Sequence, residues 1–270
     1  MNSALSWVDD VVANLDTDRF GRAVRSFEQV GSTNTEAAAW ARDGAREGSI
    51  VVTDHQTEGR GRHGRRWTAD PGTNLMLSVV LRPPLSPERL GLVTLAAGVA
   101  VADAVDSFVA PHCTTIKWPN DVLLEGRKTC GMLLESAFAG RRHAAEAPSF
   151  VILGIGLNVN QTHFPDALAD TATSLRLVVG RTVPRPPLLG RVLDDLEQRY
   201  DSLVEDDGTA VREAFHARMD RRGEPVTLRF TGTDNTISGT ARGVTASGAL
   251  ELDTADGRRV LHAGEVTGSG

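Results

Sequence analysis

The sequence predicts an α+β protein: one large domain of mixed helices and strands, followed by a small all-β domain. Between residues 27 and 221, segments with an apolar residue every three or four positions are interspersed with short apolar runs bounded by turn residues. From about Gly223 onward, short alternating segments separated by glycine turns replace the helical pattern. We therefore expect an N-terminal arm over residues 1–26, a main domain over 27–221 and a barrel-like domain over 222–270.

Helices are expected where apolar residues recur at helical spacing. Thr33-x-x-Glu36 fits a capping box that would begin one of them. Ser86-Pro87-Glu88 has the cap, the proline and the acidic first turn of another, which should bury one face. Besides a short helix in the N-terminal arm, the expected helices cover residues 33–44, 86–110, 165–168, 187–206 and 209–219.

Strands are expected where short apolar runs lie between turn residues. The polar segment Gly140–Pro148 is expected to be a turn between two of them. Gly154 and Gly156 interrupt an otherwise apolar run, which indicates that another backbone or a ligand comes close there. The expected strands cover residues 27–30, 49–53, 74–81, 115–117, 122–124, 129–137, 150–158, 225–230, 236–244, 249–252 and 258–262.

Composition excludes several classes of protein. The chain has 270 residues, a formal net charge of −6 and 40% apolar residues, enough for a substantial core. Its two cysteines, Cys113 and Cys130, form no C-x-x-C or Cys/His pattern, so we expect neither a disulfide framework nor a protein metal site. The acidic N-terminus is not typical of a signal peptide, and no apolar run nears the ~20 residues of a membrane span. These features predict a cytoplasmic protein with no membrane partner.

The glycine–arginine loop, Gly59–Arg66, holds three glycines, four arginines and one histidine in an acidic chain. Such a positive cluster indicates an anionic ligand, and glycine lets backbone N–H groups approach phosphate oxygens. The segment matches G-x-G-x-x-G, but the dinucleotide fingerprint requires a helix at the third glycine, and a strand pattern follows instead. The segment alone is compatible with two interpretations: a solvated surface loop, or a flexible clamp over a phosphate-bearing ligand.

Three further segments have a structural and a functional interpretation. Lys117 lies at a strand end before Trp118-Pro119, either as a solvated lysine or as a compact charge that neutralises a carboxylate and a phosphate. Ser32-Thr33-Asn34 can cap a helix, and a helix N-terminus also offers N–H groups to a polar ligand. Asn158 follows the glycine-interrupted strand, either as a turn residue or as a ligand contact.

Together these segments resemble the biotin protein ligase family, in order and spacing, across roughly residues 25–220. The resembling pieces are GSTNTEA at 31–37, HQTEGRGRHGRRW at 55–67, KWPND at 117–121 and GIGLNVN at 154–160. The resemblance implies a mixed-sheet biotin/lipoate ligase-type catalytic domain followed by a small SH3-like β-barrel. It implies that biotin and ATP give biotinyl-5'-AMP, and that biotin then passes to a lysine of a biotin carboxyl carrier domain of a biotin-dependent carboxylase. Mg²⁺ would arrive with ATP, held mostly by phosphates.

The resemblance also implies roles for single residues. Lys117, with Arg60 and Arg62, would be catalytic, because the repulsion between the biotin carboxylate and the α-phosphate must be neutralised. Residues implied to bind biotin are Ser32, Thr33, Asn34, Gln56, Gly59, Arg60, Gly61, Arg62, Lys117, Gly154 and Gly156. Residues implied to bind ATP or the adenylate are Arg60, Arg62, Arg65, Trp67, Lys117 and Asn158. Lys128 is left out, because Thr129-Cys130 follows it where the family usually has an apolar and a small residue.

Two other functions stay open as alternatives. One is a lipoate or octanoate ligase of the same superfamily, which KWPND together with the glycine–arginine loop disfavours. The other is a nucleic-acid-binding protein that uses the arginines and would bind with a steep salt dependence. The acidic net charge disfavours it, and a Ser-Thr-Asn motif that begins at residue 32 leaves no room for an N-terminal DNA-binding domain, so no DNA partner is expected. Ordering the loop costs about 1–2 kcal/mol per residue, so we expect it to be mobile until an anionic ligand binds.

Overall fold

The computed structural model describes residues 4–137, 149–230, 232 and 234–268. The turn predicted at 140–148 therefore lies outside the described residues. The α-helices are Ser6–Ala13 (α1), Thr33–Arg42 (α2), Gly91–Phe108 (α3), Leu175–Val179 (α4), Arg185–Glu205 (α5) and Thr209–Arg218 (α6). Short 3-10 helices cover Arg62–Gly64 (η1), Pro87–Arg89 (η2) and Asp166–Leu168 (η3). The expected helix at 165–168 is thus a single 3-10 turn.

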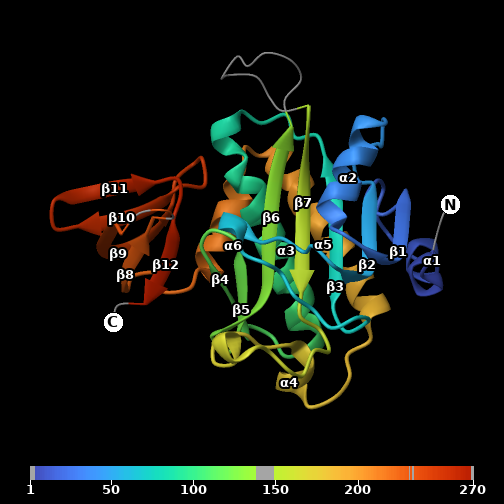
Figure 1. Ribbon diagram of the computed structural model, residues 1–270. Helices are drawn as coiled ribbons and strands as arrows, with labels where there is room; N and C mark the ends of the chain where they lie inside the picture. Colours follow the sequence, from blue (N-terminus) through green and yellow to red (C-terminus); the bar gives the residue numbers. More distant parts are fainter. Residues whose placement is uncertain (1–3, 138–148, 231, 233, 269–270) are drawn as a thin grey trace.

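The strands form two separate sheets, which confirms the predicted α+β class (Figure 1). The main sheet has the order β1-β2-β3-β7-β6-β5-β4, in which β1 and β2 are parallel and the other neighbours antiparallel. Its strands are Val24–Val30 (β1), Ile50–Gln56 (β2), Leu75–Leu81 (β3), Thr114–Lys117 (β4), Asp121–Leu124 (β5), Arg127–Ala137 (β6) and Phe150–Leu157 (β7). Every predicted strand is present, and the first begins before the predicted end of the N-terminal arm.

The second sheet is built from the C-terminal part of the chain and has the order β11-β10-β9-β8-β12. Its strands are Pro225–Arg229 (β8), Thr236–Val244 (β9), Leu250–Thr254 (β10), Gly257–Leu261 (β11) and Glu265–Gly268 (β12). Four of them were predicted and β12 was missed, because it is short and has little apolar alternation. In Figure 1 this sheet (orange to red) lies beside β4 and α6 at one edge of the molecule.

Alternation along the central strands divides the main sheet into two faces. Val79 and Leu81 pack into the large core with α3 and α5, whereas Val80 between them packs with Ala37 and Ala41 of α2. The same alternation in β7 directs Ile152 toward α2. Because side chains two residues apart share a face, the positions that follow Ile152 on its face are Gly154 and Gly156.

Helix α3 is buried on almost all sides, and the prediction that it buries one face is wrong. Its buried residues run nearly without interruption from Leu92 to Val105. The helix lies against the sheet on one side and against α5 and α6 on the others (Figure 1), so no stripe of it faces solvent. Contrary to the expectation from the sequence, the described residues include one helical segment that is apolar and long enough for a membrane span, Pro87–Phe108, and 78% of its 18-residue apolar window is buried in the fold.

Candidate active site

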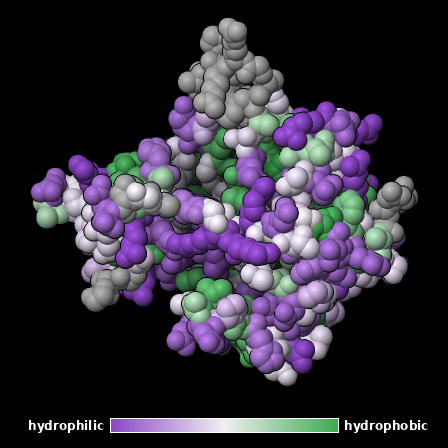
Figure 2. All heavy atoms as spheres, in the orientation of Figure 1, coloured by the Kyte–Doolittle hydropathy of each residue, from purple (hydrophilic) through white to green (hydrophobic). Residues whose placement is uncertain are grey.

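A cavity of about 630 Å³ opens on the α2 face of the main sheet. Its floor consists of Gly131, Gly154 and Gly156, and Gly131 and Gly156 are direct partners across β6 and β7. Because these residues have no side chains, the space above the sheet is open here. Further along the strands, Val80 and Ile152 fill the corresponding space. The glycine–arginine loop crosses in front of β6 and β7 and covers this space (Figure 1), and Figure 2 shows a hydrophilic band across the same part of the surface.

The cavity brings together nearly all the residues that the resemblance assigned to biotin and nucleotide. Those that line it are Ser32, Thr33, Asn34, Gln56, Arg60, Gly61, Arg62, Arg65, Trp67, Lys117, Gly154, Gly156 and Asn158. Gly59 does not line it. Its carbonyl accepts the N–H of Trp67 at 3.0 Å, and a Cβ on Gly59 would lie 2.5 Å from the Trp67 carbonyl oxygen. Glycine is therefore required at residue 59 so that the two arms of the loop can pass closely.

A buried polar network lies at the N-terminus of α2. Thr33 donates to Gln56 Oε1 from its backbone N (2.8 Å) and its hydroxyl (3.1 Å), and Ser78 Oγ donates to Asn34 Oδ1 at 2.6 Å. The amide Nδ2 of Asn34 donates to Glu135 Oε2 at 2.7 Å. The capping-box prediction is wrong: Ser32 is the N-cap, and its side chain makes no capping hydrogen bond. These side chains bond one another, so their geometry is fixed at the wall of the cavity.

Each of three arginines in the loop has a polar partner. Arg60 pairs with Glu135 at 2.9 Å, and Arg62 donates to Asn120 Oδ1 at 3.1 Å. Arg65 donates to both carboxylate oxygens of Glu265, one of them at 2.8 Å. Burial lowers the pKa of Arg62, and the hydrogen bond from Arg65 lowers the pKa of Glu265. These partners offset the mutual repulsion of the arginines, while the mobility of the loop stays a prediction.

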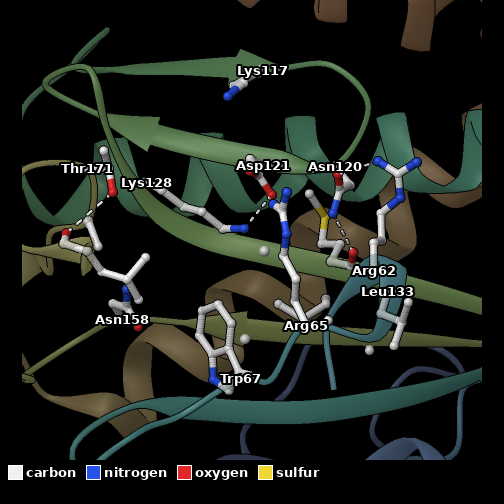
Figure 3. A pocket seen from close by; sticks show the side chains of 18 of the residues that line it. Arg62, Arg65, Trp67, Lys117, Asn120, Asp121, Lys128, Leu133, Asn158 and Thr171 are labelled. Atoms are coloured by element: carbon white, nitrogen blue, oxygen red, sulfur yellow. Dashed lines mark hydrogen bonds and ion pairs between the residues drawn. The ribbon is translucent and has the colours of Figure 1, made fainter. Parts of the chain in front are cut away.

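Two lysines reach the cavity from β4 and β6, the strands on either side of β5 (Figure 3). Lys128 Nζ forms an ion pair with Asp121 Oδ1 at 2.7 Å. Lys117 ends β4 directly opposite Asp121, and within the described part of the chain its ammonium makes no hydrogen bond or ion pair. Lys117 is thus a half-buried cation available to an anion in the cavity. Lys128, which sequence reasoning left out, also lines the cavity, and a Cβ on Gly131 would lie only 3.0 Å from its Nζ.

The glycines of β7 make room for side chains of the same chain. A Cβ on Gly156 would lie 2.6 Å from the Trp67 ring, and a Cβ on Gly154 would lie 2.2 Å from Asn34 Oδ1. The sequence predicted that another backbone or a ligand comes close to these glycines, whereas the groups that approach them are the side chains of Trp67 and Asn34. Asn158, 4% exposed, donates to the Thr173 carbonyl at 3.1 Å, so its amide fixes the end of β7 as well as lining the cavity.

Sequence reasoning missed several polar residues of this site, among them Asn120, Asp121, Glu135, Asp220 and Glu265. Asn120 and Asp121 are part of the KWPND segment, which could have signalled them. Glu265 lies on β12, in the second sheet, and reaches Arg65 across 200 positions of the sequence. No local pattern marks such a long-range pair, so only the fold reveals it.

Comparison with known proteins agrees with this geometry. A family model described as "Biotin/lipoate A/B protein ligase family" matches residues 26–158, and one described as "Biotin protein ligase C terminal domain" matches residues 223–267. The biotin–[acetyl-CoA-carboxylase] ligase of Mycobacterium tuberculosis is 37% identical over 243 residues, which cover 88% of this chain and 86% of that protein. The chain belongs to the biotin protein ligase family. The ligase of the same description from Paracoccus denitrificans is 35% identical and covers 87% of this chain and 96% of its own length.

The fold of this family member is also close to a solved structure. The biotin protein ligase from Aquifex aeolicus, determined in complex with biotin and ATP, superimposes with a TM-score of 0.77 at 28% identity. The match covers 91% of this chain and 98% of that protein, so it includes both sheets. The mixed catalytic sheet with a C-terminal β domain, expected from the sequence, is thus confirmed.

Proposed function

We propose that this biotin protein ligase converts biotin and Mg–ATP into biotinyl-5'-AMP and pyrophosphate, and then transfers biotin to a lysine of a biotin carboxyl carrier domain. The observation that supports it best is the convergence of a fixed polar network and several cations in one cavity. Biotin needs both features, because its ureido ring is neutral and polar while its valeryl chain ends in a carboxylate. A site for an anion alone would not require the network at α2.

The neutral end of biotin fits the wall formed by α2 and β2. Asn34, Thr33 and Gln56 offer donors and acceptors there, and their bonds to Ser78 and Glu135 hold their orientation. Hydrogen bonds that are already oriented need little reorganisation when a ligand binds. Ser32 and the floor at Gly154 complete this end of the cavity.

The first chemical step takes place at the cationic end. One oxygen of the biotin carboxylate attacks the α-phosphorus of ATP, a new P–O bond forms, and pyrophosphate leaves with the electrons of the bond that breaks. Lys117 lies between the two anions and neutralises their repulsion, and Arg60 and Arg62 contribute from the loop above. Gly61 allows the loop backbone to approach the phosphate. In the second step the amine of the acceptor lysine attacks the acyl carbonyl, and AMP leaves.

The nucleotide fits the remaining part of the cavity. Trp67 offers an aromatic face above Gly156, and Asn158 lies at the adjoining end of β7. Arg65 would exchange Glu265 for a phosphate when ATP binds. In the part of the chain that the structure describes, no three histidine, cysteine or carboxylate side chains converge on a metal site. We infer that Mg²⁺ enters with the substrate Mg–ATP, coordinated mainly by phosphate oxygens and water, as expected from the resemblance.

The test is incubation of the protein with biotin, Mg–ATP and an apo biotin carboxyl carrier domain, scored by the mass of the carrier. We expect one added biotin on a single lysine, and none when ATP is omitted. Lipoate replaces biotin in a parallel reaction to test the alternative ligase. Modification with lipoate and not with biotin would overturn the proposal.

A further inference from the structure

The chain that leaves α6 runs alongside β4 at the cavity. Met219 pairs in parallel with Ile116, and the backbone N–H of Asp220 donates to the Ile116 carbonyl at 2.9 Å. This pairing places Asp220 beside Lys117, the next residue of β4, and both side chains line the cavity. An aspartate therefore lies next to the cation to which we assign the acyl phosphate.

The other carboxylates of the cavity differ from Asp220 in their surroundings. Asp121 is paired with Lys128 at 2.7 Å, Glu265 is paired with Arg65, and Asp170 is exposed at the rim. The Asp220 side chain is only 23% exposed. Its closest cation is Arg221 on the same segment, with Nε 4.0 Å from Oδ2, and Arg221 is shared with the exposed Glu224 at 3.7 Å.

Burial raises the pKa of this carboxylate. Desolvation raises the pKa of Asp220, while the positive charges of Arg221 and Lys117 act in the opposite direction. Of the described carboxylates that line the cavity, Asp220 is the one that is mostly buried and has no close ion pair. A carboxylate in these surroundings is better suited to accept a proton than to form a structural salt bridge.

We propose that Asp220 accepts the proton of the acceptor lysine in the second half-reaction, a role that rests on the proposed function. The lysine enters as an ammonium and gives one proton to an Asp220 oxygen. Its nitrogen lone pair then forms the C–N bond to the acyl carbon, and the bond from that carbon to the phosphate oxygen breaks. AMP leaves with the electron pair, and the nitrogen releases a second proton to water.

The surroundings of Asp220 favour this transfer in two ways. Lys117, Lys128 and Arg62 disfavour another cation in the cavity, so they lower the pKa of an entering ammonium. The position beside Lys117 also brings the amine to the acyl group that Lys117 holds. The first half-reaction needs no such base, because the biotin carboxylate is already ionised at neutral pH. The two half-reactions should therefore respond differently to loss of this carboxylate.

The test compares the wild type with Asp220→Asn, which keeps the size of the side chain and the backbone bond to Ile116. Three rates are measured: the single-turnover release of pyrophosphate, the transfer of biotin to the carrier lysine, and the reaction of the bound adenylate with hydroxylamine. Hydroxylamine is neutral at pH 7 and needs no base. Glu224→Gln serves as a charge-matched control, because Glu224 is exposed and lies outside the cavity lining.

We expect Asp220→Asn to slow carrier transfer by about 10²–10⁴-fold, the usual contribution of a general base, while the other two rates stay within about twofold of wild type. Glu224→Gln should match the wild type in all three. Equal losses of pyrophosphate release and transfer, a slowed hydroxylamine reaction, or unchanged transfer would each overturn the assignment of Asp220. A wild type that releases no pyrophosphate with biotin would refute the proposed function itself, and this inference with it.

Discussion

Substitution of Gly154 by alanine should damage the biotin end of the cavity in a way that the geometry quantifies. The added Cβ would lie 2.2 Å from Asn34 Oδ1, 3.0 Å from its Cγ and 3.2 Å from its Nδ2, so the whole amide must move. Asn34 would then lose the bond from Ser78 at 2.6 Å and weaken the bond to Glu135 at 2.7 Å. Overpacking of this kind costs about 1–3 kcal/mol, and a lost buried hydrogen bond about 0.5–1.5 kcal/mol more.

We therefore expect Gly154→Ala to lower the free energy of unfolding by about 2–4 kcal/mol. Since Asn34 is displaced from the ligand, the KM for biotin should rise at least about tenfold, equivalent to about 1.4 kcal/mol. The KM for ATP should change little, because the three atoms nearest to the new methyl group all belong to Asn34. Urea unfolding measures the first quantity, and initial rates of pyrophosphate release measure the other two.

Gly190→Ala is the matched control for this substitution. Gly190 lies inside α5, where a Cβ would meet Val11 Cγ1 at 3.7 Å and Leu15 Cδ2 at 3.9 Å, both ordinary contacts. Alanine should stabilise this helix by up to about 1 kcal/mol without changing either KM. An unchanged KM for biotin in Gly154→Ala would refute the placement of the ureido ring at Asn34, even if the variant were less stable.

Three further predictions concern the cations and the contacts between the two sheets. Lys117→Ala should lower the rate of pyrophosphate release by at least about 10²–10³-fold and leave the unfolding curve unchanged. Near-normal release would contradict the catalytic role assigned to Lys117. Glu265→Gln removes the ionic partner of Arg65, so amide hydrogen exchange in the glycine–arginine loop should become several-fold faster. Because the hydrogen bond from Arg65 lowers the pKa of Glu265, the pair persists at neutral pH, and acid should release the loop of the wild type as the pH falls through that lowered pKa. A loop that stays as protected in acid, or in the variant, as in the wild type at neutral pH would contradict this. Trp118→Phe removes the indole N–H that donates to the Gly248 carbonyl at 3.0 Å, so it should cost about 1–3 kcal/mol of unfolding free energy, and an unaltered midpoint in urea would argue against this contact as a tie between the sheets.

Local patterns were sufficient to predict most elements of this fold. The apolar period of Leu75–Leu81 and that of Arg185–Glu205 each follow from the local environment of one element, so both can be detected in the sequence. The environment of α3 is different, because apolar neighbours surround it, and the periodic pattern suggested one buried face where nearly all are buried. The short β12 lacked any such signal, and its position depends on its pairing with β8.

For the site, the sequence identified which residues line the cavity better than it identified the residues with which they pair. Lys117, Arg62 and Asn34 were placed by short motifs, and the cavity does bring them together. Gly156 was expected to admit another backbone or a ligand, whereas the group that approaches it in the structure is the side chain of Trp67. The pairing of Arg65 with Glu265 could not be anticipated, because it joins distant segments whose spacing carries no pattern.

The central claim is that this cavity forms biotinyl-5'-AMP from biotin and ATP. The most direct measurement mixes the protein with an excess of biotin and Mg–ATP without a carrier domain, quenches the mixture and identifies the bound product by mass spectrometry. We predict a burst of one biotinyl-5'-AMP and one pyrophosphate per active site, dependent on biotin. Release of pyrophosphate without biotin, or the absence of any adenylate on the protein, would contradict the claim.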